Sequence, residues 1–398
     1  MAIIKNVKVY KENELINATV ITEGNLIAEV FPTSKIIPEK YSTEQIFDGN
    51  GQLLIPGMID VHIHGAKNYD MMDGSTESIQ AVSMACAETG CTSFLVTSVS
   101  SSLEDLIQMI RQTKKVVGKE QGAKIAGIHL EGPYLNIEKK GMQNPAYLRH
   151  PDLKEMKQIF DEADGLIKMV TIAPELPGGI ELIDFLKKRG VVIAIAHSNA
   201  TYEEAQDAFE KGATHITHCF NAMPAIHHRA PGLVTAALEN DAVSVQTIVD
   251  GVHLHPGIVR LIHKIKGPDK IVLTTDALQA MGVGDGEYIF GGHQVTVKEG
   301  IARLQDGTLA SSTVTMNKSL RLSNEFGISL QDSIQMATST PAEILGMKKF
   351  GRIEKGYIAD LVLLDEKFEV LTTWINGEKY KTAGLISSKE WFINDAII

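Results

Sequence analysis

Short apolar runs alternate with helical patterns through the middle of the chain. Segments such as residues 77–90 and 102–118 place apolar residues at helical spacing and end in glycine. Nearly continuous apolar runs lie between such segments and are typical of parallel strands buried on both faces. Eight of these runs predict an α/β fold, a closed (β/α)8 TIM-like barrel. The runs are GMIDVHIHG (57–65), TSFLVTS (92–98), KIAGIHLEG (124–132), IKMVTIAPE (167–175), VVIAIAHS (191–198), THITHCFN (214–221), VSVQTIVDG (243–251) and KIVLTTDA (270–277).

The two ends of the chain follow a different pattern, in which apolar and polar residues alternate with a period of two. This period is typical of half-buried strands. We predict that residues 1–52 and 350–398 together form a small β-sandwich domain. The barrel, residues 53–349, would then be inserted between its two halves. Residues 284–308 interrupt the strand–helix alternation and predict an inserted hairpin.

Composition narrows the classes of partner. The chain has 398 residues and a net charge of −11, which argues against nucleic acid or a membrane as a partner. An anionic substrate would therefore need cationic side chains gathered locally. Three cysteines do not form a disulfide framework, so a reducing compartment is expected. The N-terminus lacks the features of a signal peptide, and no apolar run approaches the roughly 20 residues of a membrane span. We expect a cytoplasmic protein.

Polar residues gather where the predicted strands end, which is where a barrel of this kind carries its active site. The first strand ends in His62 and His64, two residues apart and therefore on one face. Further polar residues follow other strands: His129, Glu131, His197, His218, His253 and Asp276. Their convergence on one end of the barrel predicts a metal site.

Each of these residues also has a purely structural interpretation. Asp60 is either a partner of the histidine pair or a strand-end cap. His129 and Glu131 share a face, and one of them could have only a structural role. His197 could be a buried imidazole satisfied by the backbone, and Asp276 could be a helix N-cap. The cysteines are expected in the core: Cys86, Cys91 and Cys219.

The types of side chain indicate the class of metal. Several imidazoles with one carboxylate suit zinc, iron or another first-row divalent ion better than magnesium or calcium. Five candidate ligands exceed the needs of one open zinc site, so two ions sharing a bridging carboxylate are possible. These ligands are His62, His64, Glu131, His197 and His218.

The motifs together resemble the amidohydrolase superfamily and, within it, the N-acetylglucosamine-6-phosphate deacetylase family. The similarity covers nearly the whole chain. Its motifs are PGMIDVHIHG, GIHLEGPYLN, AHSNATYEEA, THCFNAMPAIHHRAPG, DGVHLHP, TTDAL and GRIEKGYIADLVLLD. The HxH element identifies only the superfamily, whereas HLEGP with THCFNAM and HHRAPG is much narrower. The resemblance implies hydrolysis of N-acetylglucosamine 6-phosphate to glucosamine 6-phosphate and acetate, in amino-sugar catabolism and cell-wall sugar recycling.

The resemblance also assigns the metal ligands and the base. Glu131, His197 and His218 would hold the main divalent metal, with zinc first and iron, manganese or cobalt as alternatives. His62 and His64 would hold a second ion bridged by Glu131. Asp276 would serve as general base and then as general acid, which suits the proton transfers of amide hydrolysis.

The implied substrate-binding residues are Asn221, the backbone at Ala222, Arg229 and His253, with a weaker role for Gln143. In the family Arg229 and His253 reach the neighbouring subunit's site, which implies a homodimer. His227 and His228 would add positive charge beside Arg229. At Ser311 the family pattern leads us to expect a glycine.

Two other functions compete with this one. Another amidohydrolase, such as a cyclic-amide hydrolase or a deaminase, is the first. Cyclic-amide hydrolases usually bridge their metals with a modified lysine at the end of the fourth strand, and here Lys168 lies near the start of that strand. The second alternative is a metal-binding sugar sensor without turnover, which would have no need of a base such as Asp276.

Overall fold

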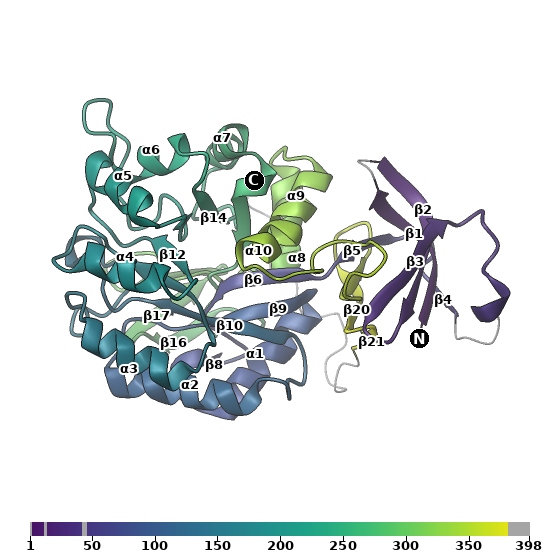
Figure 1. Cartoon of the computed structure of the whole chain (residues 1–398), viewed down its shortest axis with the longest axis horizontal. Helices are drawn as coiled ribbons and strands as arrows, with labels where there is room; N and C mark the ends of the chain where they lie inside the picture. Colours follow the sequence, from purple (N-terminus) through teal and green to yellow (C-terminus); the bar gives the residue numbers. More distant parts are fainter. Residues whose placement is uncertain (1, 12–13, 42–45, 381–398) are drawn as a thin grey trace.

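Eight parallel strands form a barrel in the middle of the chain (Figure 1). The computed structural model describes residues 2–11, 14–41 and 46–380. Around the sheet the strands follow one another in chain order, which confirms the predicted barrel. They are β6 (Met58–Ile63), β9 (Cys91–Thr97), β10 (Lys124–Glu131), β11 (Ile167–Ile172), β12 (Val192–Ile195), β13 (His215–Ile216), β14 (Ser244–Ile248) and β15 (Ile271–Thr274).

The barrel closes between its first and last strands. Ile63 in β6 forms a parallel bridge with Ala277, just after β15. The buried carboxylate of Asp60 accepts hydrogen bonds from the hydroxyls of Thr274 at 2.7 Å and Thr275 at 2.5 Å. Asp60 therefore joins β6 to the end of β15, and its Oδ1 also accepts a hydrogen bond from the backbone nitrogen of His62 at 3.1 Å.

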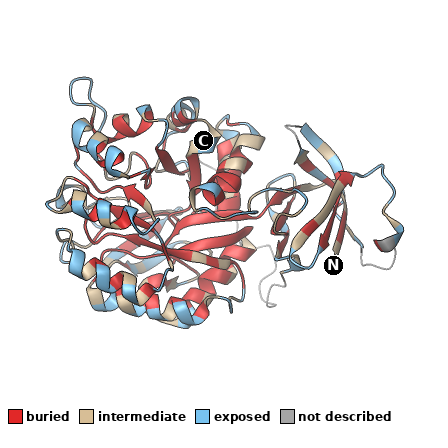
Figure 2. Ribbon diagram, viewed as in Figure 1, coloured by how far each residue is buried: buried red, intermediate tan, exposed pale blue. Residues whose placement is uncertain are grey.

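Helices cover the outside of the barrel, with their buried faces turned toward the strands (Figure 2). In α2 the side chain of Ser102 caps the N-terminus, and Leu106, Met109 and Ile110 are buried at helical spacing. Among the described residues, none of the helices has both the length and the apolar character that a membrane crossing needs. The helices are α1 (Thr76–Glu88), α2 (Leu103–Val116), α3 (Leu153–Ala163), α4 (Gly179–Lys187), α5 (Tyr202–Lys211), α6 (Gly232–Glu239), α7 (Pro256–Lys266), α8 (Met316–Glu325), α9 (Leu330–Ala337) and α10 (Ser339–Ile344).

Side chains fill the barrel interior near the beginnings of its strands. Ile59, Val61, Leu95, Met169 and Val272 form one buried cluster there, against which α10 packs through Ala342. The interior is therefore a packed core and not a pore. This closed floor leaves the opposite end of the barrel for the polar residues.

The two ends of the chain meet in a second sheet, which stands beside the barrel (Figure 1). Strand β5 joins the halves, because it pairs with β1 on one side and with β19 on the other. The predicted β domain built from both termini is thus present. Its boundaries at residues 52 and 350 stay a prediction, and residues 381–398 lie outside the described part of the chain. The strands are β1 (Ala2–Lys11), β2 (Glu14–Glu23), β3 (Leu26–Pro32), β4 (Ile46–Asp48), β5 (Leu53–Pro56), β19 (Leu361–Leu364), β20 (Val370–Ile375) and β21 (Glu378–Lys379).

The insert predicted at residues 284–308 is a small antiparallel sheet of three strands, one more than a hairpin. Its strands are β16 (Gly286–Phe290), β17 (His293–Lys298) and β18 (Ile301–Leu304). The buried ring of Phe290 lies 5.3 Å from the ring of His64, measured between centroids. Phe290 of the insert therefore packs beside His64. A further pair of two-residue strands, β7 (Gly65–Ala66) and β8 (Tyr69–Asp70), follows β6.

Replacement of Trp374 by alanine tests the contribution of the terminal sheet to stability. Trp374 is only 2% exposed and packs in the core of that sheet. We expect Trp374→Ala to lower the free energy of unfolding by about 3–5 kcal/mol, the usual effect of emptying a large buried site. Urea unfolding followed by circular dichroism measures it. Leu371→Ala on the same strand is the matched control, because Leu371 is 50% exposed. An effect there as large as that of Trp374→Ala would contradict the prediction.

Candidate metal centre

Six polar side chains from five strand ends meet at the C-terminal end of the barrel. They form two groups, and within each group the possible ligand atoms lie within 4.8 Å of one another. All six residues are buried, although their side chains are imidazoles or carboxylates, which usually retain some exposure to solvent. Buried polar atoms without solvent need partners, so the clustering demands a chemical explanation. The first group is His62, His64 and Asp276, and the second is Glu131, His197 and His218.

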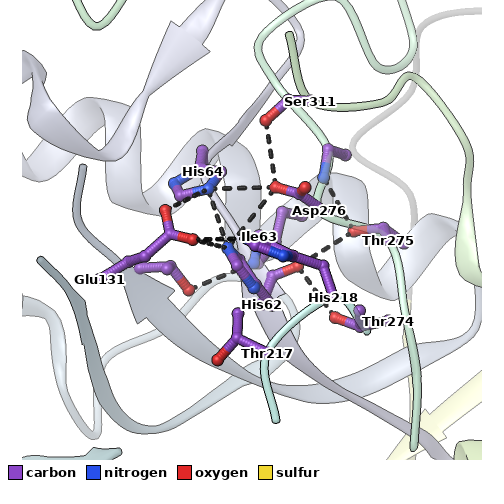
Figure 3. Close-up of polar contacts among 12 residues, drawn as sticks. His62, Ile63, His64, Glu131, Thr217, His218, Thr274, Thr275, Asp276 and Ser311 are labelled. Carbon is purple, nitrogen blue, oxygen red and sulfur yellow. Dashed lines mark hydrogen bonds and ion pairs between the residues drawn. The ribbon is translucent and has the colours of Figure 1, made fainter. Parts of the chain in front are cut away.

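The first group arises from one strand and the turn that closes the barrel. His62 and His64 are two residues apart and so point to the same side, with their Nε2 atoms 3.0 Å apart. Asp276 follows β15, and its Oδ1 lies 3.1 Å from the His64 Nε2 and 3.5 Å from the His62 Nε2. Figure 3 shows these three side chains pointing toward one another.

The second group is built around Glu131 at the end of β10. Its Oε1 lies 3.0 Å from the Nε2 of His218 and 3.4 Å from the Nε2 of His197. The same carboxylate is 3.6 Å from both His62 and His64, one through each oxygen. Glu131 therefore contacts the histidines of both groups, and its contacts with His62 and His64 can be followed in Figure 3.

An unusual backbone conformation turns three of these side chains over the barrel end. His197, His218 and Asp276 have positive φ angles of 45°, 31° and 49°. Each follows the end of a strand, and residues other than glycine rarely adopt this region. Such conformations cost about 1–3 kcal/mol each and concentrate at functional sites. The strain at three converging positions is an independent indication that their placement serves function.

Burial and mutual attraction shift the pKa values of His62, His64, Glu131 and Asp276. Burial lowers the pKa of His62 to about 4, although Asp276 and Glu131 oppose that shift. Burial would also lower the pKa of His64, but the hydrogen bond and charge of Asp276 and the charge of Glu131 raise it to about 9. Burial would raise the pKa values of Glu131 and Asp276, but the neighbouring histidines lower both below their ordinary values. The carboxylates are therefore ionised at neutral pH and suited to a cation.

The donor set fits a divalent metal. The Nε2 atoms of His197 and His218 lie 3.1 Å apart, much as those of His62 and His64 do. Two ring nitrogens at this distance repel unless one carries a proton or both direct lone pairs at a shared cation. Buried imidazoles with carboxylates are the donor set of first-row divalent ions. The two groups can therefore hold divalent metal ions, with Glu131 available to both.

Other groups hold Glu131 and His197 in place, and the sequence did not reveal them in this role. The amide nitrogen of Gln143 donates to Glu131 Oε2 at 2.6 Å, while its oxygen accepts from the backbone of Ser100. The carbonyl of Lys139 accepts from His197 Nδ1 at 2.9 Å. Residues this far apart in the chain carry no shared sequence pattern that could have shown these contacts.

Ser311 is a second such support, at the position where we expected glycine. Its φ of 62° explains the expectation, because that conformation favours glycine. Its hydroxyl donates to Oδ1 of Asp276 at 3.0 Å (Figure 3). The departure from the family pattern thus adds a hydrogen bond to the carboxylate.

His129 has a structural role. Its Nδ1 bonds to the carbonyl of Val61 and its Nε2 to the hydroxyl of Thr171, so both ring nitrogens are occupied inside the barrel. Of His129 and Glu131, which share a face of β10, Glu131 is the one that belongs to a ligand group. The three cysteines are all buried, as expected.

The predicted substrate-binding residues lie at different distances from the centre. Gln143 contacts Glu131 directly, and Asn221 contacts the His218 carbonyl through its side-chain nitrogen. Ala222 and His197 both flank Gly141, since a Cβ added to that glycine would lie 3.6 Å from the Ala222 Cβ and 3.2 Å from the His197 Cε1.

Arg229 and His253 bond within their own loops. Arg229 is exposed and contacts the ring of His228 at 2.7 Å. The Nδ1 of His253 bonds to the carboxylate of Asp250, also at 2.7 Å. Their predicted contact with a phosphate stays a prediction.

Comparison with known proteins agrees with this barrel. Residues 53–379 match the model of the amidohydrolase family, and the chain belongs to that family. Among its relatives, the N-acetylglucosamine-6-phosphate deacetylase of Bacillus subtilis (strain 168) is 36% identical over 381 residues, covering 94% of this chain and 96% of that protein. The N-acetylgalactosamine-6-phosphate deacetylase of Escherichia coli O157:H7 is 33% identical over 336 residues, covering 84% and 89%.

A solved structure extends the similarity to the whole architecture. It is an N-acetyl-D-glucosamine-6-phosphate deacetylase mutant from Mycobacterium smegmatis in complex with N-acetyl-D-glucosamine 6-phosphate. The match has a TM-score of 0.88 at 32% identity and covers 96% of this chain and 99% of that one.

Replacement of His62 by alanine tests whether the two groups bind metal separately. We expect the variant to keep one tightly held divalent ion per chain, because Glu131, His197 and His218 remain. Metal analysis after dialysis measures the stoichiometry. The matched control is His215→Ala, a buried histidine of the same barrel that belongs to neither group, and it should keep both ions. Loss of all metal from His62→Ala would mean that the two groups are one inseparable site.

Proposed function

We propose that the protein hydrolyses the acetamide of N-acetylglucosamine 6-phosphate to give glucosamine 6-phosphate and acetate. This reaction would serve amino-sugar catabolism and cell-wall sugar recycling, in the cytoplasm. The observation that carries the proposal is the ionised carboxylate of Asp276 beside a buried cluster of four imidazoles and Glu131. The names of the relatives support the choice of substrate.

We propose zinc as the resident metal, with iron, manganese and cobalt as alternatives that the same ligands would accept. Glu131, His197 and His218 would hold one ion, and His62 and His64 a second that shares Glu131. When bound, such an ion supplies Lewis acidity toward the acetyl carbonyl and the attacking water.

Asp276 would move the protons of the reaction. Hydrolysis of an amide needs one proton removed from the attacking water and one delivered to the departing amine. The carboxylate is fixed for this purpose, because Ser311 donates to Oδ1 and the Asp276 backbone nitrogen donates to the His62 carbonyl at 2.8 Å. Since its pKa is held at about 2, Asp276 is ionised and can accept the first proton at neutral pH.

Local cations would bind the phosphate of the substrate, since the chain as a whole is acidic. The exposed segment at residues 227–229 contains two histidines and Arg229, whose guanidinium can hold a phosphate with two hydrogen bonds. His253 would assist. We propose that Arg229 and His253 serve the site of a second copy of the chain in a homodimer.

Other functions fit the residues less well. A lysine-bridged cyclic-amide hydrolase would need a lysine at the end of β11. Here Lys168 lies near its start and bonds outward to the carbonyl of Gly165. A sugar sensor would not require Asp276. N-acetylgalactosamine 6-phosphate is a second candidate substrate, because one relative is named an N-acetylgalactosamine-6-phosphate deacetylase.

Acetate release from four sugars tests the proposed substrate. We expect fast release from N-acetylglucosamine 6-phosphate and little from N-acetylglucosamine, N-acetylgalactosamine or N-acetylgalactosamine 6-phosphate. Arg229→Ala should raise the KM for the phosphorylated sugar about 10–100-fold, the loss of one or two charge-assisted hydrogen bonds. Arg189→Ala, which lies before β12 at the other end of the barrel, is the control and should match the unaltered chain. Equal effects of Arg229→Ala on both glucosamine sugars would refute the phosphate assignment.

Replacement of Asp276 by asparagine tests the proton-transfer role. The change keeps the size of the side chain but removes the charge that accepts the proton. We expect kcat to fall about 10²–10⁴-fold, the usual contribution of a positioned acid–base group. Metal analysis of the same sample checks that the ions remain, and Asp306→Asn in the insert is the surface control. Near-native turnover by Asp276→Asn would remove this residue from the role.

A further inference from the structure

Gln246 is a fully buried polar residue below the two ligand groups. It lies in the middle of β14 and points into the barrel, with 0% exposure. Its Oε1 is 3.1 Å from Nδ1 of His62 and 3.4 Å from the backbone nitrogen of His218. Its amide nitrogen contacts the sulfur of Met169 at 3.5 Å. One side chain therefore touches a ligand of the first group and the backbone of a ligand in the second.

The contact with His218 fixes which end of the Gln246 amide faces the histidines. A backbone N–H can only donate a hydrogen bond, so the atom that it faces must be the amide oxygen. That oxygen can only accept. The proton of the neutral His62 ring must therefore sit on Nδ1, the nitrogen that faces the oxygen.

The position of this proton determines the state of the other ring nitrogen of His62, Nε2. With the proton on Nδ1, the lone pair of a neutral ring lies on Nε2, which faces His64, Glu131 and Asp276. We propose that Gln246 is a positioning residue that fixes the tautomer and orientation of His62 and so presents its Nε2 to a divalent ion. The inference rests on the metal site of the proposed function, although it is tested by metal binding and not by turnover.

The second group contains a matching arrangement with a different acceptor. His197 Nδ1 faces the backbone carbonyl of Lys139, which is likewise an acceptor only. By contrast, the Nδ1 atoms of His64 and His218 are buried and have no hydrogen-bond partner within the described part of the chain. Each group thus has one histidine oriented by an oxygen. In the first group that oxygen belongs to a side chain, so substitution can remove it. Partners of this kind commonly change metal affinity about 10–100-fold.

Zn²⁺ binding to the metal-stripped full-length chain tests this role, by competition with a chromophoric chelator. We expect Gln246→Leu to weaken one of two Zn²⁺ sites about 10–100-fold and to leave the other unchanged. Gln246→Glu keeps an acceptor beside Nδ1 and should bind both ions at least as tightly as the unaltered chain. The matched control is Ser244→Ala, on the same strand and face. Ser244 also bonds to a histidine Nδ1, at 2.6 Å, but that residue, His215, belongs to neither group. This control should keep both affinities.

A double variant shows whether the effect passes through His62. If it does, Gln246→Leu combined with His62→Ala will bind Zn²⁺ no more weakly than His62→Ala alone. Unchanged affinity at both sites in Gln246→Leu, or additive losses in the double variant, would overturn the proposal. If Gln246→Leu does not fold, Gln246→Glu decides, because a weakened site there contradicts the acceptor role. Absence of deacetylase activity with the expected Zn²⁺ pattern would overturn only the proposed function.

Discussion

The buried charge of Glu131 is the constraint on which the site depends. A carboxylate removed from water costs several kcal/mol unless opposite charge and hydrogen bonds replace its hydration. Here Gln143 donates to one of its oxygens, and four imidazoles from three other strands approach it within 3.0–3.6 Å. The barrel makes this possible, because the ends of parallel strands bring residues from the whole chain to one point. A divalent ion in the same place would complete the replacement of water.

The strained backbone at His197, His218 and Asp276 follows from the same requirement. A regular strand would carry these side chains past the barrel end, whereas a left-handed residue turns them back across it. The energetic cost of the positive φ angles is borne by loops that the rigid barrel supports. Contacts between β6 and the end of β15 provide one such support. Asp60 links the first strand to Thr274 and Thr275, immediately before Asp276. The proposed base is therefore attached to the barrel wall by a buried network and not by a free loop.

Much of this arrangement could be predicted from the sequence, for a physical reason. Strand periodicity and the parallel barrel together determine where a strand-end residue must lie. Position therefore placed His62, His64, Glu131, His197, His218 and Asp276 among the candidates, together with His129 and His253, and the resemblance to a family assigned their roles. The supports were not, since Gln246 is 184 residues from His62 and no local pattern links them. The structural role of His129 was equally hidden, because its partners are a backbone carbonyl and a threonine on another strand. The hydroxyl of Ser311 acts where a glycine was expected.

The pairing of β5 with β19 has a consequence for how the chain is made. Leu361 lies opposite Pro56 in this sheet, so two neighbours in space are separated by the whole barrel in the order of synthesis. While the ribosome is still adding the barrel, β5 has β1 beside it on one side and an open edge on the other. Exposed strand edges pair readily with other chains, and contacts of such long sequence separation form late. The edge of β5 is therefore open to pairing with other chains until β19 has been synthesised.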